Sequence, residues 1–170
     1  MSQALDSGLE VTVTDEDGTS AVAQALAGVL RAGDVVALTG TLGAGKTFFV
    51  RSLARALGVP PEIPVRSPSF VLALVYEGRL PIFHLDLYRL TDEDELEAIG
   101  WRDWLDAGAL CLVEWADRVP DALPAVRLDV HLEPTGVEER RITLGTRGWP
   151  AARVAELRSA VSVVPTGTPL

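Results

Sequence analysis

The chain has 170 residues, of which 48% are hydrophobic and 23% charged, and this composition predicts a single globular domain with a well-filled core. Its net charge of −9 argues against a protein that grips nucleic acid unaided, because an acidic surface repels phosphate. A single cysteine, Cys111, excludes an internal disulfide, and without a cysteine pair or a His-rich cluster no zinc site is expected. The N-terminal residues do not resemble a secretory signal and no apolar run is long enough to span a membrane, so we expect a cytoplasmic protein without a membrane partner.

Strand and helix patterns alternate through the first third of the chain. Alternating apolar and polar residues indicate a half-buried strand, and a continuous β-branched run indicates a strand that is buried on both faces of a parallel sheet. Thr19 or Ser20 is expected to cap the first helix, and Gly58 to end the second. In chain order, the expected elements are a strand at 9–14, a turn at 15–18, a helix from 19 to about 31, a strand at 35–39 and a helix at 46–57.

The rest of the chain contains two hairpin patterns and three further helical segments. Glu77-Gly78-Arg79 is a turn signal between two apolar runs, and Thr91 with Asp94 fits a capping box. In chain order, the expected elements are a loop at 62–67, strands at 70–76 and 80–88, a helix at 91–99, a helical turn at 101–105, a strand at 109–113, a hairpin of 126–132 and 140–144, and a helix at 150–161.

A phosphate-binding motif joins the second strand to the second helix. Residues 40–47, Gly-Thr-Leu-Gly-Ala-Gly-Lys-Thr, match G-x-x-x-x-G-K-[ST]. The glycines allow the N–H groups of residues 43–48 to surround phosphates, Lys46 reaches the β and γ oxygens, and the Thr47 hydroxyl ligates Mg²⁺. The chain has fifteen basic residues, and all except Lys46 are arginines. Its one lysine therefore stands at the position where this motif requires a lysine.

The motif also predicts the fold class. We expect one α/β P-loop NTPase domain at residues 1–162, with a mixed, mainly parallel central sheet flanked by helices, and a frayed tail at 163–170. A guanine-specific enzyme would carry an N-K-x-D motif, which a chain with one lysine cannot also provide. ATP is therefore the favoured nucleotide.

Two carboxylates are candidates for positioning Mg²⁺ or the attacking water. Glu114 ends the apolar run 109–113, and Asp86 lies on one face of its predicted strand with His84 and Tyr88. The alternatives are that Glu114 is a mere strand-end acid and that the three polar residues form a solvated strand face.

The segment Ser67-Pro68-Ser69-Phe70 lies where related nucleotide enzymes place a switch loop. Its hydroxyls could reach the γ-phosphate or the metal, and a proline turn with local serine hydrogen bonds is an equally good interpretation. His131 has no evident partner in the sequence and is interpreted as structural or exposed.

Four motifs in this order closely resemble the TsaE family, the small bacterial P-loop ATPases of tRNA threonylcarbamoyladenosine synthesis. They are Gly-x-Leu-Gly-Ala-Gly-Lys-Thr, Ser-Pro-Ser-Phe, His-Leu-Asp-Leu-Tyr-Arg and Val-Glu-Trp, and the resemblance runs from about Thr19 to Pro124. Two positions depart from the family pattern. Thr41 stands where the family usually has an acid, and Ser69 stands where it usually has threonine.

The resemblance implies partners as well as a reaction. Family members act with the TsaB–TsaD pair, in which TsaD transfers the threonylcarbamoyl group to a tRNA adenosine, and ATP hydrolysis is thought to permit repeated turnover. RNA would then be contacted indirectly, through the complex, which agrees with the acidic net charge.

The resemblance also implies roles for individual residues. Lys46, Asp86 and Glu114 look catalytic, with Thr47, Glu114 and Asp86 around Mg²⁺, and Trp115 looks like a residue that orders the site or a partner surface. The expected nucleotide-binding residues are Thr19, Gly43, Ala44, Gly45, Lys46, Thr47, Phe48 and Ser69. Two other readings stay open on the sequence alone: a small-molecule kinase that uses the same loop, and a nucleotide-gated assembly factor without productive hydrolysis.

Overall fold

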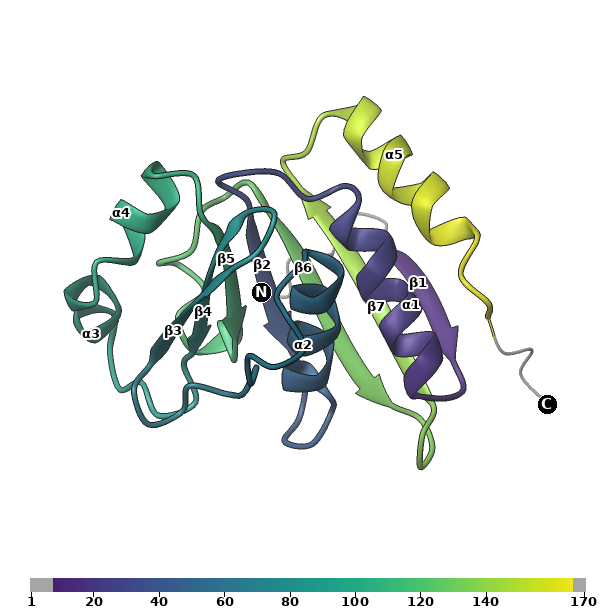
Figure 1. Cartoon of the computed structure of the whole chain (residues 1–170), viewed down its shortest axis with the longest axis horizontal. Helices are drawn as coiled ribbons and strands as arrows, with labels where there is room; N and C mark the ends of the chain where they lie inside the picture. Colours follow the sequence, from purple (N-terminus) through teal and green to yellow (C-terminus); the bar gives the residue numbers. More distant parts are fainter. Residues whose placement is uncertain (1–7, 167–170) are drawn as a thin grey trace.

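A computed structural model describes residues 8–166 of the chain as a seven-stranded sheet with helices on both faces (Figure 1). The strands are β1 (Leu9–Val13), β2 (Val35–Thr39), β3 (Ala73–Glu77), β4 (Pro81–Asp86), β5 (Leu110–Glu114), β6 (Arg127–Pro134) and β7 (Arg140–Arg147). The helices are α1 (Glu16–Ala27), α2 (Lys46–Ala56), α3 (Glu93–Ala98), α4 (Trp101–Asp106) and α5 (Ala151–Ser162), with a short 3₁₀ turn η1 (Ala116–Arg118).

The strand order is β1-β7-β6-β2-β5-β4-β3. The four central strands, β6, β2, β5 and β4, pair in parallel, and antiparallel strands complete both edges. The predicted α/β class and mixed sheet are therefore confirmed. Because the central strands are parallel, β2, β4 and β5 all end at the same edge of the sheet, and their C-terminal residues meet there.

The alternation of side chains along β2 divides the core into two layers. Val36 and Leu38 join the larger core with residues of α1, α2 and α5, whereas Val35 and Ala37 face the smaller core, which contains Trp101 of α4. Figure 1 shows α1, α2 and α5 together on one side of the sheet. The strand between the two layers is therefore apolar and buried from Val35 to Leu38, as the parallel-sheet pattern predicts.

Two helix starts differ from the prediction. Asp15, rather than Thr19 or Ser20, caps α1, because its carboxylate accepts a hydrogen bond from the N–H of Gly18 at 2.8 Å. The residues read as a turn are thus the first turn of the helix, and α1 ends at Ala27 rather than near residue 31. In α3 the cap is Asp92, which accepts from the N–H of Glu95, while the hydroxyl of Thr91 donates to the Glu95 carboxylate.

The hairpin of β3 and β4, at one edge of the sheet, begins later and ends earlier than predicted. β3 begins at Ala73 because Leu72 has a positive φ of 65°, which interrupts the extended backbone. β4 ends at Asp86, whose carboxylate accepts a hydrogen bond from the N–H of Tyr88 and turns the chain out of the sheet. β7 extends to Arg147, three residues beyond the expected hairpin, which predicted an end at residue 144.

At the C-terminal end, Val164 packs against the larger core, and residues 167–170 lie outside the described part of the chain. The division between a domain at 1–162 and a tail at 163–170 stays a prediction.

Among the helices of residues 8–166, none combines the length and apolar character needed to cross a membrane.

Gly40 is required by a close backbone approach. Its φ is 141°, and a Cβ at this position would collide with the carbonyl oxygen of Leu132 on β6. We expect Gly40→Ala to reduce the free energy of unfolding by about 3 kcal/mol or more, measured by urea denaturation. Gly43→Ala is the matched control, since Gly43 has a φ of 78° with no atom near its Cβ position, and it should cost only about 1 kcal/mol. Equal losses in the two variants would contradict the steric argument.

Cys111 is buried in β5, and burial raises the pKa of its thiol to about 12. Because the thiolate is the reactive form, the folded protein should react with a disulfide reagent such as DTNB at pH 8 at a rate limited by unfolding. In guanidinium chloride the thiol regains a pKa of roughly 8.5 and should react within seconds. Fast labelling of the folded chain would show that β5 is accessible.

Candidate functional site

A cleft of about 400 Å³ lies at the C-terminal edge of β2, β4 and β5. It is bordered by the glycine loop, the segment 67–69, the end of β4 and the end of β5. The residues that line it are Leu42, Gly43, Gly45, Lys46, Thr47, Phe48, Ser67, Ser69, Asp86, Tyr88, Arg89, Glu114 and Trp115. The topology thus brings together four segments that are far apart in the sequence.

The glycine loop presents backbone donors to this cleft. Gly43 and Gly45 have φ values of 78° and 103°, which other residues rarely adopt. Gly45 is the N-cap of α2 and offers no side chain to the N–H groups of the first helical turn, so these groups remain available to an anion. Arg140 of β7 braces the loop from behind, because its Nε donates to the carbonyl of Ala44 at 3.0 Å.

Lys46 lies at the centre of the cleft and is almost fully buried. Its Nζ donates to the carbonyls of Gly40 at 2.7 Å and Thr41 at 2.8 Å, and lies 3.8 Å from the ring centroid of Trp115. Burial lowers the pKa of Lys46, while negative charges nearby, that of Glu114 foremost, act in the opposite direction. A desolvated ammonium group of this kind interacts strongly with any anion that enters the cleft.

A hydrogen-bonded chain links α2, β5 and β4 at the base of the cleft. The hydroxyl of Thr47 lies 3.0 and 2.9 Å from the two carboxylate oxygens of Glu114, and Nε2 of His84 lies 2.8 Å from Oε1 of the same carboxylate. Glu114 and His84 are both buried. A carboxylate held from two sides has a fixed orientation, and this is a requirement for a group that positions a metal ion or its waters.

Asp86 is the neighbour of Glu114 across the parallel pair β4–β5. Its Oδ2 accepts from the hydroxyl of Ser67, and its Oδ1 accepts from the N–H of Tyr88 at 2.9 Å. It is 3% exposed, so it is not part of a solvated strand face. The bond to Ser67 also shows that the Ser-Pro-Ser segment reaches the cleft, which the turn interpretation does not require.

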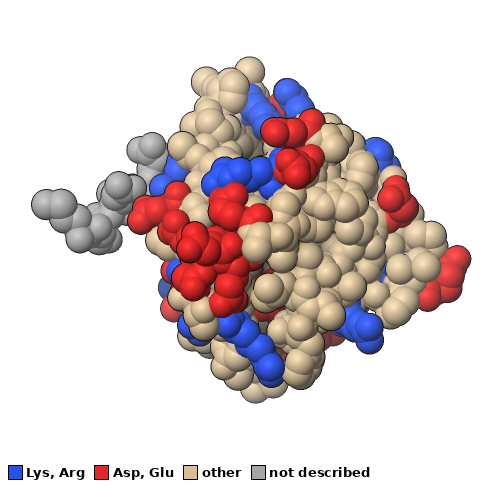
Figure 2. Space-filling model, turned by 90° about the vertical axis from the view of Figure 1, so that its left-hand side faces the viewer, with Lys and Arg blue, Asp and Glu red and all other residues tan. Residues whose placement is uncertain are grey.

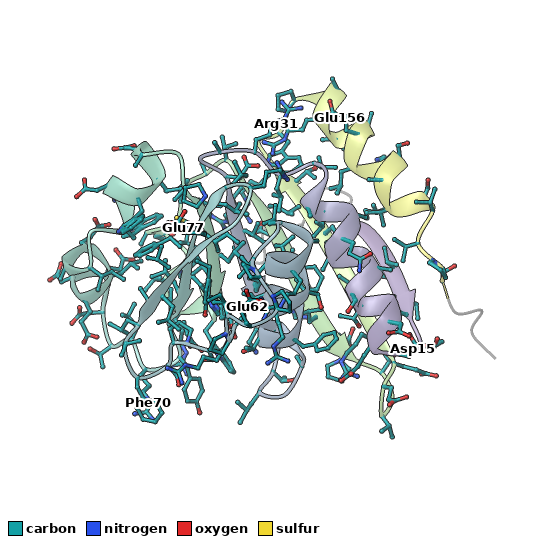
Figure 3. The ribbon with its side chains drawn as sticks, viewed as in Figure 1. Asp15, Arg31, Glu62, Phe70, Glu77 and Glu156 are labelled. Atoms are coloured by element: carbon teal, nitrogen blue, oxygen red, sulfur yellow. The ribbon has the colours of Figure 1, made fainter. Side chains whose placement is uncertain are left out.

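Aromatic and arginine side chains form the mouth of the cleft. Trp115 has a positive φ of 58°, and its ring packs on Tyr88 with 4.8 Å between centroids. The guanidinium of Arg89 lies 4.3 Å from the ring centroid of Phe70, which is 81% exposed and points away from the body of the molecule (Figure 3). The mouth therefore combines apolar rings with cations.

Two of the expected nucleotide-binding residues are placed differently from the rest. Ala44 is buried in the larger core, so only its backbone belongs to the loop. Thr19 lies inside α1, because the helix begins at Glu16. Its buried hydroxyl contacts the carbonyl of Asp15, and it does not line the cleft. The other six, Gly43, Gly45, Lys46, Thr47, Phe48 and Ser69, all line it, as do Asp86 and Glu114.

Two residues that support the site are not evident from local sequence patterns. His84 was noted only as part of a polar face, and its contact with Glu114 depends on the β4–β5 pairing. Arg140 reaches the loop from 96 residues away, so no local pattern could reveal it. His131, interpreted as structural or exposed, is exposed, and its Nδ1 lies 2.9 Å from the hydroxyl of Thr39.

The acidic residues do not form a metal site by themselves. Within residues 8–166, no group of three or more His, Cys, Asp or Glu side chains is arranged to hold a metal ion. One hydroxyl, from Thr47, and the carboxylate of Glu114 do converge. This donor set fits Mg²⁺, which commonly keeps several waters and takes its remaining ligands from substrate phosphates.

Comparisons with known proteins agree on one family. A family model described as "Threonylcarbamoyl adenosine biosynthesis protein TsaE" matches residues 13–142, a range that includes every residue lining the cleft. The Bacillus subtilis protein named tRNA threonylcarbamoyladenosine biosynthesis protein TsaE is 40% identical over 138 residues, which cover 81% of this chain and 84% of the relative. The Mycobacterium leprae protein of the same name is 38% identical over 159 residues, 88% of this chain and 96% of the relative.

A solved structure gives the same result in three dimensions. A crystal structure of Bacillus subtilis YdiB is similar to this chain with a TM-score of 0.72 and 33% sequence identity. The similarity covers 91% of this chain and 94% of that chain. The fold is therefore shared over nearly the whole length of both molecules.

Because His84 contacts the buried Glu114, we expect its replacement to destabilise the protein more than replacement of the other histidine, His131. His84→Leu removes a hydrogen bond from a buried carboxylate and should cost about 2 kcal/mol in urea denaturation at pH 7. His131→Leu, at the exposed position, should change stability by less than about 0.5 kcal/mol. A His84→Leu variant as stable as the wild type would mean that Glu114 does not depend on this partner.

Proposed function

The chain belongs to the TsaE family, and from this premise we propose that it binds and hydrolyses MgATP as an accessory subunit of tRNA threonylcarbamoyladenosine synthesis. Its partners would be the TsaB and TsaD proteins, and hydrolysis would permit repeated turnover by their complex. The observation that supports this most strongly is the position of the only lysine: Lys46 lies in a glycine loop beside the paired Thr47 and Glu114.

Each group of the cleft has a role in this proposal. The N–H groups of residues 43–48 and the ammonium of Lys46 hold the phosphates. The Thr47 hydroxyl and the Glu114 carboxylate hold Mg²⁺, which when bound neutralises the developing charge on the phosphate oxygens. Asp86, held by Ser67 and the N–H of Tyr88, would position the metal ion or orient the attacking water.

The charge distribution supports the division of labour with partners. Acidic side chains gather on the side of the molecule that carries α3 and α4 (Figure 2), and the first turn of α3 contains Glu93, Asp94 and Glu95. Such a surface does not attract RNA. We therefore propose that tRNA is contacted through the complex rather than by this chain, and that the protein works in the cytoplasm, where tRNA is modified.

An omission assay tests the proposal. TsaB, TsaD and threonylcarbamoyl-AMP synthase from the same organism are combined with tRNA, threonine, bicarbonate and ATP, and modified tRNA and released phosphate are counted in the same tube. Without this chain, product should stop near one tRNA per TsaD, and with it product should continue through many turnovers. Lys46→Ala and Asp86→Asn should reduce phosphate release at least about 100-fold and abolish repeated turnover.

Matched variants make this assay specific. Lys46→Arg keeps the charge but replaces a compact ammonium with a planar fork, so it should fail like Lys46→Ala. Asp103→Asn, at an exposed position on α4, should behave like the wild type. Equal product with and without the chain would overturn the pathway role, and transfer of the γ-phosphate to a metabolite would favour a kinase. Repeated turnover supported by a non-hydrolysable ATP analogue would favour an assembly factor.

A further inference from the structure

A second cavity, of about 230 Å³, lies on the face of the sheet opposite α1 and α2. Its floor consists of residues that alternate along β2, β6 and β7, among them Ala37 and Thr39 of β2, and its wall is the segment that follows β5. None of its lining residues belongs to the cleft described above. It is therefore a separate site.

The floor contains an unusual arrangement of charges. Arg127 of β6 and Arg147 of β7 occupy directly opposed positions in the antiparallel ladder, where like charges repel each other. Both contact one carboxylate, that of Asp129, with Nε–O distances of 2.7 Å for Arg127 and 3.4 Å for Arg147. Two guanidinium groups thus share the carboxylate of Asp129, and a second carboxylate, that of Asp117, lies on the wall of the cavity, so the charges of the lining balance.

The two arginines differ in how firmly they are held. The side chain of Arg127 is only 9% exposed, and its Nη1 also donates to the carbonyl of Pro124 at 3.0 Å. Its Nη2 has no hydrogen-bond acceptor within residues 8–166. The side chain of Arg147 is 41% exposed and remains able to turn toward a ligand. A preorganised donor beside an adjustable one is suited to binding a carboxylate.

The rest of the lining limits what else the ligand can carry. Small and apolar residues surround the centre of the cavity, among them Ala37 and Gly145 of the floor and Ala116, Pro120 and Leu123 of the wall. Asp117, on the wall formed by η1, disfavours a second negative charge. The volume, which is below that of most drug-sized pockets, accepts only a compact molecule.

We propose that this cavity is a binding site for a small monocarboxylate with a compact apolar body, held by Arg127 and Arg147. The guanidinium pair, with Nη2 of Arg127 free to donate, selects for one anionic group, and the apolar wall selects for the body. Asp117 disfavours phosphate monoesters, which carry a second negative charge, and nucleotides are too large for the cavity. The inference is independent of the proposed ATPase activity, because it uses no residue of the phosphate loop.

Benzoate and its neutral isostere benzamide are suitable probes. In ¹H–¹⁵N correlation spectra of the full chain, benzoate should shift the amides of Thr143 and Gly145 with a Kd of about 1 mM, as expected for so small a ligand. Benzamide should bind about tenfold more weakly, since it lacks the charge. Shifts confined to Gly43 and Gly45 would instead mean that the probe binds the phosphate loop as a simple anion, and would overturn the proposal.

A pair of arginine variants on one strand completes the test. Arg147→Gln should weaken benzoate binding about tenfold, whereas Arg141→Gln should leave it unchanged, because Arg141 lies on the same strand but outside the cavity, near Glu10 and Glu133. Arg147 is partly exposed, so its replacement should not prevent folding. Equal affinities for benzoate and benzamide, or equal effects of the two substitutions, would overturn the assignment.

Discussion

The structure depends on one buried carboxylate, that of Glu114. A charge at this depth is tolerated only if hydrogen bonds replace its lost hydration, and here they come from Thr47 on α2 and His84 on β4. These contacts join the central strand pair to the helix that follows the glycine loop. The hydrogen bonds that stabilise the buried charge also fix the direction of the carboxylate, so the orientation of Glu114 and the packing of the sheet depend on the same contacts.

The central strand β2 contributes to both cavities of the molecule: its C-terminal end leads into the glycine loop, and one of its faces lines the second cavity. At its C-terminal end, Gly40 passes so close to the carbonyl of Leu132 that only glycine fits, which sets the path of the loop toward Lys46. On the opposite face, Ala37 and Thr39 are small enough to leave a cavity rather than fill it.

The sequence was sufficient where the position of a residue depends on local spacing and insufficient where it depends on the pairing of distant strands. Lys46 and Glu114 could be predicted because each follows a strand pattern within a few residues, and the strand order then brings them together. Thr19 was assigned to the site by resemblance, but Asp15 begins the helix earlier and leaves Thr19 buried within it. The contact of Arg140 with the loop depends on the β6–β7 hairpin, which no pattern around residue 44 encodes.

Arginine side chains make the structural contacts in which a cation is needed, so the chain needs a lysine at one position alone, that of Lys46. Several arginines satisfy backbone carbonyls or carboxylates, as when Arg55 donates to the carbonyls of the loop after α2, and Arg153 contacts both Asp34 and the carbonyl of Val29. A planar fork suits such tasks because it binds two acceptors at once. A site that binds and releases an anion needs the opposite: a compact charge that exchanges one oxygen acceptor for another. Lys46, already bonded to two carbonyls of its own loop, has such acceptors to return to.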